Sequence, residues 1–138
     1  MDVAPHPNYA ENGWIYIHYT DRCSDCNEAS RQSKRPVSMN KVIRGRIRDG
    51  TWVDQETIWE ADIATYSSTS DLAAGGRLAF DGKGHLFFSV GIKDTHDYLG
   101  VQDLDLPYGK IHRVNDDGSI PDDNPFVGVA GALPSIWT

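Results

Sequence analysis

A series of short β-type segments, separated by tight turn signals, is the feature of this sequence that most constrains its fold. Residues 14–19 are aromatic and β-branched, and an Asn-Gly pair at 12–13 precedes them. Residues 41–48 and 51–60 flank the Asp-Gly pair at 49–50, which is typical of a β-hairpin. No segment has the apolar period of a convincing helix. The pattern therefore predicts an all-β chain of antiparallel strands.

The hairpin at Asp-Gly is predicted to close through a three-residue loop, Arg48 to Gly50. This register places Arg46 opposite Trp52 and Arg44 opposite Asp54 on one face. Cation–π and opposite-charge pairs of this kind contribute about 0.2–1 kcal/mol each. A two-residue loop would lose those pairs, so the sequence favours the odd-numbered loop.

A second hairpin is predicted where residues 77–80 lead through Asp-Gly-Lys-Gly into residues 85–90. A four-residue loop pairs Leu78 with Phe87 and leaves both faces of the hairpin substantially apolar, so we expect both faces to be buried. In an antiparallel protein, this indicates sheets that stack face to face. A further short strand is expected at 109–114.

Length and charge limit the remaining possibilities. A chain of 138 residues suits one domain, and residues 120–138, rich in proline and glycine, are expected to be mostly loop. The net charge of −7 argues against a nucleic-acid partner, which needs a basic face. No apolar run approaches the roughly 18 residues of a membrane span, and no signal peptide follows Met1.

The only cysteines, Cys23 and Cys26, lie in a polar stretch that we interpret as an insertion loop at about residues 20–38. A disulfide local to this loop, or two free thiols, is the favoured interpretation. A metal site would need about four ligands, and no second cysteine pair exists. A thioredoxin-like motif would open a helix after a strand. Metal binding and redox chemistry remain the alternatives.

Four runs in register resemble the pyrroloquinoline-quinone (PQQ) dependent glucose/sorbosone dehydrogenase family, also described as soluble aldose sugar dehydrogenases. The resemblance covers nearly the whole chain apart from the cysteine loop and residues 66–70. The runs are His6-Pro7 with Asn12-Gly13-Trp14-Ile15-Tyr16, Gly75-Gly76-Arg77-Leu78-Ala79-Phe80, Gln102-Asp103-Leu104 with Gly109-Lys110-Ile111, and Asp123-Asn124-Pro125-Phe126 with Gly131-Ala132-Leu133-Pro134.

The resemblance implies that residues 1–138 form a partial β-propeller domain. About two to three blades of a six-bladed β-propeller are expected, each an antiparallel four-stranded sheet. The implied cofactors are PQQ and calcium, and the implied partners are a sugar and an external electron acceptor. It also implies a periplasmic or secreted location, and a sequence that continues beyond Thr138 through an Arg-Asn run that helps to hold the quinone.

Two positions depart from the family pattern. The family's general base is a histidine just before the Gly-Gly-Arg-Leu run, where this chain has Ala73 and Ala74. The family often carries an aspartate after the glycine that follows the second hairpin, where this chain has Ile92 after Gly91. These departures keep a second hypothesis open, a non-catalytic propeller that serves as a binding module. A thiol or metal function of the cysteines is a third and weaker one.

The candidate site residues follow from the same resemblance. His96 is the candidate substitute base, because it lies in the loop that leaves the second hairpin and has flanking carboxylates. We expect structural roles for the other four histidines, with His85 solvated. Turn chemistry explains Asp116-Asp117-Gly118 and Asp122-Asp123-Asn124 better than calcium binding does, and no metal ligand is assigned. The predicted cofactor-binding positions are Gly75, Gly76, Arg77, Gly91, Ile92 and Gln102.

Overall fold

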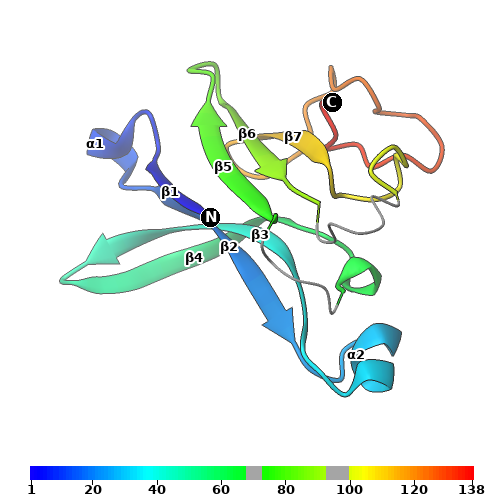
Figure 1. The fold of residues 1–138 in the computed structure, drawn as a ribbon. Coiled ribbons are helices and arrows are strands. Elements are labelled where there is room, and N and C mark those ends of the chain that lie inside the picture. The colour runs from blue at the N-terminus through cyan, green and yellow to red at the C-terminus, as the bar shows by residue number, and fades with distance from the viewer. Residues whose placement is uncertain (68–72, 93–99) are drawn as a thin grey trace.

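The computed structural model describes residues 1–67, 73–92 and 100–138 and contains two antiparallel sheets (Figure 1). The first sheet has the order β1-β2-β3-β4, with β1 at Asp2–Pro5, β2 at Ile15–Cys23, β3 at Val37–Arg48 and β4 at Thr51–Glu60. The second has the order β5-β6-β7, with β5 at Gly75–Phe80, β6 at His85–Val90 and β7 at Lys110–Asn115. No helix within these described ranges is long and apolar enough to cross a membrane.

The end of the chain lies beside the free edge of β7. The backbone N–H of Arg113 donates to the Ser135 carbonyl (2.8 Å), and that of Trp137 donates to the Ile111 carbonyl (2.8 Å). A single antiparallel bridge joins His112 and Ile136. The last residues thus add the beginning of a fourth strand to the second sheet. The rest of 120–138 is loop and turn, which confirms that prediction.

The core fills the space between the two sheets. Tyr16, Met39 and Val42 of the first sheet are fully buried, as are Leu86 and Phe88 of the second. Burial of a side chain of this size contributes about 1.5–3 kcal/mol. The two sheets therefore hold each other face to face, as the second hairpin predicted.

The β3–β4 hairpin closes through two residues, so the predicted three-residue loop is wrong. Arg48 pairs with Thr51, and both Asp49 (φ 51°) and Gly50 (φ 74°) have positive φ. Such a turn matches the right-handed twist of the strands, and this local preference decides the register. Arg46 consequently lies opposite Val53 rather than Trp52.

The hairpin contains the predicted ion pairs and cation–π contact, but between different partners. A bulge between Arg44 and Arg46 brings Arg44 opposite Glu56, and their side chains form an ion pair at 2.6 Å. Arg46 binds Asp54 at 3.0 Å. Its guanidinium lies 3.6 Å from the ring centroid of Trp14, so Trp14 takes the cation–π position that we expected for Trp52.

The β5–β6 register is also shifted by one residue from the prediction. Leu78 lies opposite Phe88, because Asp81 closes the turn by accepting hydrogen bonds from the backbone N–H groups of Lys83 (2.7 Å) and His85 (3.1 Å). One face of the hairpin is buried, while Ala79 on the other face is exposed. The expectation of two buried faces is therefore wrong for the described chain.

The predicted loop at 20–38 is shorter than expected and contains a helix. β2 runs on to Cys23 and β3 begins at Val37, and between them lies α2, Glu28–Ser33. The side chain of Asn27 caps α2 by accepting from the Ser30 N–H (2.9 Å). A second helix, α1 at Tyr9–Asn12, is a single turn. The prediction of no helix is wrong, because a cap and a six-residue helix leave no apolar periodicity.

The insertion is held by a disulfide and by the side chain of Asn27. Cys23 and Cys26 form a disulfide, which confirms the first of the predicted alternatives. Asn27 Nδ2 donates to the carbonyls of Ile63 (2.8 Å) and Tyr66 (3.0 Å), at either end of the 3-10 turn η1, Ile63–Thr65. The insertion therefore braces the segment between β4 and β5.

Asp116, in the turn after β7, ties the two sheets together at a second place. Its carboxylate lies 3.0 Å from His6 Nε2. Its carbonyl accepts from the Tyr16 hydroxyl (2.6 Å) and from Arg44 Nη1 (2.9 Å). The structural role predicted for His6 is confirmed, and Asp116 joins the two sheets.

Candidate functional site

Three predicted site glycines come together where β5 begins and β6 ends. The Gly91 N–H donates to the Ala74 carbonyl (2.9 Å), and the Gly91 carbonyl accepts from the Gly109 N–H (3.3 Å). A Cβ on Gly91 would overlap the Ala73 carbonyl, and one on Gly75 would lie 2.8 Å from the Gly91 nitrogen. These backbones approach too closely for any side chain. We call Ala73–Gly76 with Gly91 the glycine junction.

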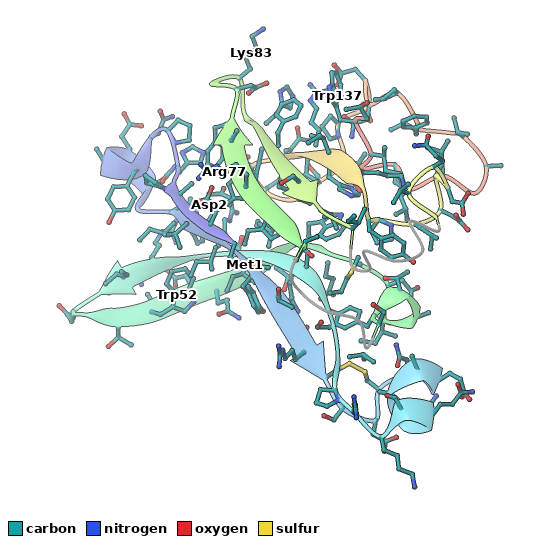
Figure 2. All side chains as sticks on the ribbon, in the orientation of Figure 1. Met1, Asp2, Trp52, Arg77, Lys83 and Trp137 are labelled. Atoms are coloured by element: carbon teal, nitrogen blue, oxygen red, sulfur yellow. A yellow bond between two sulfur atoms is a disulfide. The ribbon has the colours of Figure 1, made fainter. Side chains whose placement is uncertain are left out.

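Arg77 directs its side chain away from this junction. The side chain is 82% exposed, and its Nη1 lies 3.5 Å from the Asp2 carboxylate (Figure 2). The same carboxylate accepts from the Leu78 N–H at 3.0 Å, and this backbone hydrogen bond lowers the pKa of Asp2 more than Arg77 does. Arg77 is therefore neither buried within a blade nor turned into a pocket formed by the described residues.

The other predicted positions are spread more widely. Ile92 is half-buried directly after the junction. Gln102 is exposed and lies in a shallow depression that it shares with residues 103–105 and 129–132, not with the glycine junction. His96 lies outside the described residues, so its role as substitute base stays a prediction.

Buried Lys110 holds the segment that carries Gln102. Its ammonium donates to the carbonyls of Val101 and Tyr108, both at 3.1 Å. Burial lowers the pKa of Lys110. The segment 100–109 is thus wrapped around a cation and docked beside the glycine junction through Gly109.

A buried polar pair, which the sequence-based reasoning missed, supports the junction from the first sheet. Asn40 is fully buried, and its Nδ2 donates to the Ala74 carbonyl (2.8 Å) and to His18 Nε2 (2.9 Å). Burial lowers the pKa of His18 to about 4, with smaller contributions from the N-terminal ammonium and His112. A signal was available, because His18 shares its strand face with Trp14 and Tyr16, and Asn40 shares its face with Val42.

His112 has a structural role, as predicted. It is fully buried and stacked on Phe88 with a centroid distance of 5.2 Å. Its Nε2 lies 2.8 Å from the Pro107 carbonyl and must donate to it, so Nδ1 accepts from the Ser135 hydroxyl (2.9 Å). Burial lowers the pKa of His112 to about 4. Both ring nitrogens are engaged, which leaves none for proton transfer.

His85 is not simply solvated, as we had predicted. Its Nδ1 lies 2.6 Å from Asp81, and its ring also lies 3.0 Å from Nη2 of the buried Arg113. Arg113 in turn binds Asp123 at 2.7 Å and lowers the pKa of that carboxyl group. The Asp122-Asp123-Asn124 run thus anchors an arginine. Among the described residues, no three His, Cys, Asp or Glu side chains gather in a way that could hold a metal ion.

Comparison with known proteins places this architecture. The family model described as Glucose / Sorbosone dehydrogenase matches residues 1–138. The chain belongs to the glucose/sorbosone dehydrogenase family. This finding confirms the resemblance that the four sequence runs carry.

Individual relatives agree with this assignment. The chain is 50% identical over 140 residues to the aldose sugar dehydrogenase YliI of Escherichia coli, with 100% of this chain and 34% of the relative covered. A crystal structure of the soluble aldose sugar dehydrogenase from Escherichia coli in the apo-form has a TM-score of 0.80 at 32% identity, and covers 99% of this chain and 36% of that one.

A more distant structure shares the fold. The PQQ-bound aldose sugar dehydrogenase from Streptomyces coelicolor has a TM-score of 0.68 at 22% identity, with 97% of this chain and 34% of that chain covered. The two sheets are therefore partial blades of a β-propeller, as the sequence predicted. The chain spans about a third of the length of the relatives that it matches.

Proposed function

We propose that the protein to which this chain belongs is a PQQ-dependent dehydrogenase that oxidises an aldose or a related sugar. The observation that carries this proposal is the 50% identity, over the whole chain, to an aldose sugar dehydrogenase. The match to a PQQ-bound relative adds support for the cofactor through the shared fold. When bound, PQQ would supply the redox chemistry by accepting a hydride from the sugar, while the protein supplies orientation and charge.

The glycine junction fits a role in holding a flat cofactor. Gly75, Gly76 and Gly91 let backbone segments pack directly on one another at one end of the two sheets, which gives this end a fixed main-chain shape. Glycines serve this purpose in other cofactor sites. Gly75, Gly76, Gly91 and Ile92 would line the quinone site. Arg77 and Gln102 would join them only if the remainder of the propeller brings further groups to them.

The proposed reaction needs a proton acceptor, and this chain lacks the histidine that the family uses for it. Ala73, which stands at or near the position of the family's base, cannot accept a proton. Loss of a general base removes about 10²–10⁴-fold in rate. We propose His96 as the substitute. A calcium ion is proposed for the whole protein and is assigned to no residue of this chain.

Reconstitution of the full-length protein tests the proposal. PQQ and calcium are added, quinone binding is measured by titration, and dye reduction is followed across a panel of aldoses and polyols. Binding at micromolar quinone and sugar-dependent dye reduction are expected. A protein that binds no quinone at micromolar concentration would refute the proposed function.

Ala73 and Ile92 favour a second candidate function, a propeller that binds a sugar, peptide or surface ligand without turning it over. The same titration separates the two. Quinone binding without dye reduction, together with sugar binding in calorimetry, would support the binding module. A loss of dye reduction of about 10²–10⁴-fold in His96→Ala, without loss of quinone affinity, would support the enzyme.

The location and redox partner follow only from the family. We propose a periplasmic or secreted protein that passes electrons to an external acceptor. Fractionation of cells that express the full-length gene, with an antibody against this chain, tests the location directly.

A further inference from the structure

The structure contains a hydrogen-bonded pair whose position suggests a role beyond packing. We propose that Asn40, held in place by His18, is a positioning residue that fixes the Ala74 carbonyl and thereby the shape of the glycine junction. The link to quinone binding rests on the proposed function, whereas the link to the junction does not.

The Ala74 carbonyl is one of the places where hydrogen bonds join the two sheets. It accepts from Asn40 Nδ2 of β3 at 2.8 Å and from the Gly91 N–H after β6 at 2.9 Å. A carbonyl oxygen has two lone pairs, so both are occupied. The residue is buried, with 4% of its surface exposed, and water cannot readily replace either donor. Loss of Asn40 would leave the carbonyl held from one side only.

The chemistry of the pair requires an amide at position 40 and a neutral imidazole at position 18. Asn40 Nδ2 has two hydrogens, and the second donates to His18 Nε2 at 2.9 Å. His18 must therefore carry its proton on Nδ1. The lowered pKa of His18 agrees with this neutral form. A carboxylate at position 40 would have the same shape as the amide, but it would offer no donor to either partner.

Two polar atoms of the pair are buried without a hydrogen bond among the described residues. His18 Nδ1 and Asn40 Oδ1 are buried and have no hydrogen-bond partner in the part of the chain that the structure describes. Leaving such groups unpaired costs free energy that an apolar pair would avoid. Most buried polar groups in native proteins are hydrogen-bonded, so these two atoms call for a specific explanation. The only described contact of the pair that leaves its own sheet through a hydrogen bond is the one to the glycine junction.

The test compares Asn40→Asp with a matched control, Asn124→Asp, in the full-length protein. Asn124 is also buried, and its Nδ2 donates to two carbonyls, those of Arg113 and Pro134, both at 2.9 Å. Each variant loses its own two Nδ2 donors, but only Asn40 contacts the junction. The carboxylate at 124 would still accept from Arg113 Nη1, which lies 3.2 Å from Asn124 Oδ1. Hydrogen exchange is measured on the apo protein, and quinone affinity is measured by titration.

We expect Asn40→Asp to speed exchange in peptides covering 73–76 and 90–92 and to weaken quinone binding about tenfold, the factor that corresponds to one lost hydrogen bond. Asn124→Asp is expected to leave both exchange at the junction and quinone affinity as in the wild type. Wild-type exchange and affinity in Asn40→Asp, or the same changes in both variants, would overturn the inference.

A second pair of variants decides the question if Asn40→Asp does not fold. His18→Gln keeps an acceptor near the position of Nε2, whereas His18→Leu removes it. Faster exchange at the junction in His18→Leu, with wild-type exchange in His18→Gln, supports the inference, and equal exchange in both variants opposes it. If the wild-type protein binds no quinone, the proposed function fails, but the exchange comparison still decides the role of Asn40.

Discussion

Two buried histidines, His18 and His112, are held neutral by the fold. The pKa of each is lowered to about 4 from an ordinary value of 6.5, mainly because burial disfavours the charged ring. The unfolded chain therefore binds more protons than the folded one between these two values. The stability that the neutral rings contribute is fully present above pH 6.5 and is lost as the pH falls towards 4.

This titration predicts an acid-sensitive fold. We expect each histidine to account for on the order of 3 kcal/mol of lost stability between pH 7 and pH 4. The measurement is the unfolding midpoint of the full-length protein as a function of pH. His112→Asn is expected to melt lower at pH 7 but to lose less on acidification. Parallel curves for wild type and variant would show that His112 does not titrate in this way.

Gly91 gives a residue-scale test of the glycine junction. Gly91→Ala places a methyl group against the backbone carbonyl of Ala73, which cannot move without displacing the junction. We expect lower stability, by about 1–3 kcal/mol as for other overpacked sites, and weaker quinone binding. Calorimetry and quinone titration measure the two effects.

The control for Gly91→Ala is Gly45→Ala. Its new methyl group would meet the ring of Trp52, a side chain of the β3–β4 hairpin. Destabilisation without a change in quinone affinity is expected there. Equal quinone affinities in Gly91→Ala and wild type would show that the glycine junction is not part of the cofactor site.

At the scale of the elements, the sequence predicted most of the strands, but it failed on one hairpin register, on helix α2 and on the contacts between the sheets. The existence of β2 to β7, the two hairpins and the final loop followed from alternation and turn residues, whereas β1 was not predicted. The register of β3–β4 did not, because cross-strand pairs were weighed above the positive φ that Asp49 and Gly50 both adopt. Helix α2 was missed because its stability comes from the Asn27 cap and tertiary anchoring. The pairing of Asn40 with Ala74 depends on how the two sheets meet, which no local pattern encodes.

The disulfide insertion provides a prediction at this scale. The Cys23–Cys26 bridge closes a very short loop, and the chain-entropy estimate for such a loop is about 2 kcal/mol. We expect Cys23→Ser with Cys26→Ser to lower the melting temperature modestly and to expose residues 24–36 to protease. Timed digestion of the full-length protein with proteinase K, which cleaves at many residue types, with mass spectrometry of the cuts, checks this.

Asn27→Ala extends that experiment. The variant keeps the disulfide but loses the hydrogen bonds to Ile63 and Tyr66. Faster cleavage in both 24–36 and 61–67 would show that the insertion braces the segment between the two sheets. Faster cleavage within 24–36 alone would mean that the bracing is not significant.

At the scale of the whole molecule, the described residues leave apolar side chains exposed at the edge of the second sheet, where further blades of a propeller would cover them. Ile111 is 37% exposed and Trp137 is 40% exposed beside the incipient fourth strand. Exposed apolar faces and strand edges favour self-association. We expect the isolated 138-residue chain to be oligomeric, poorly soluble or only marginally folded. Sedimentation velocity with a melting curve tests this, and a monomer with a sharp cooperative melt would contradict it.

The joint at Asp116 has a consequence for how the protein is made. The Tyr16 hydroxyl finds its acceptor 100 residues later in the chain. At about 5–20 residues per second, a ribosome needs roughly 5–20 s to synthesise that stretch. For part of this interval, after Glu60 and before β5 begins at Gly75, the first sheet is complete in sequence but the sheet that packs on it has not been made. The nascent chain therefore has a window in which a chaperone, rather than the second sheet, is the natural cover for Tyr16.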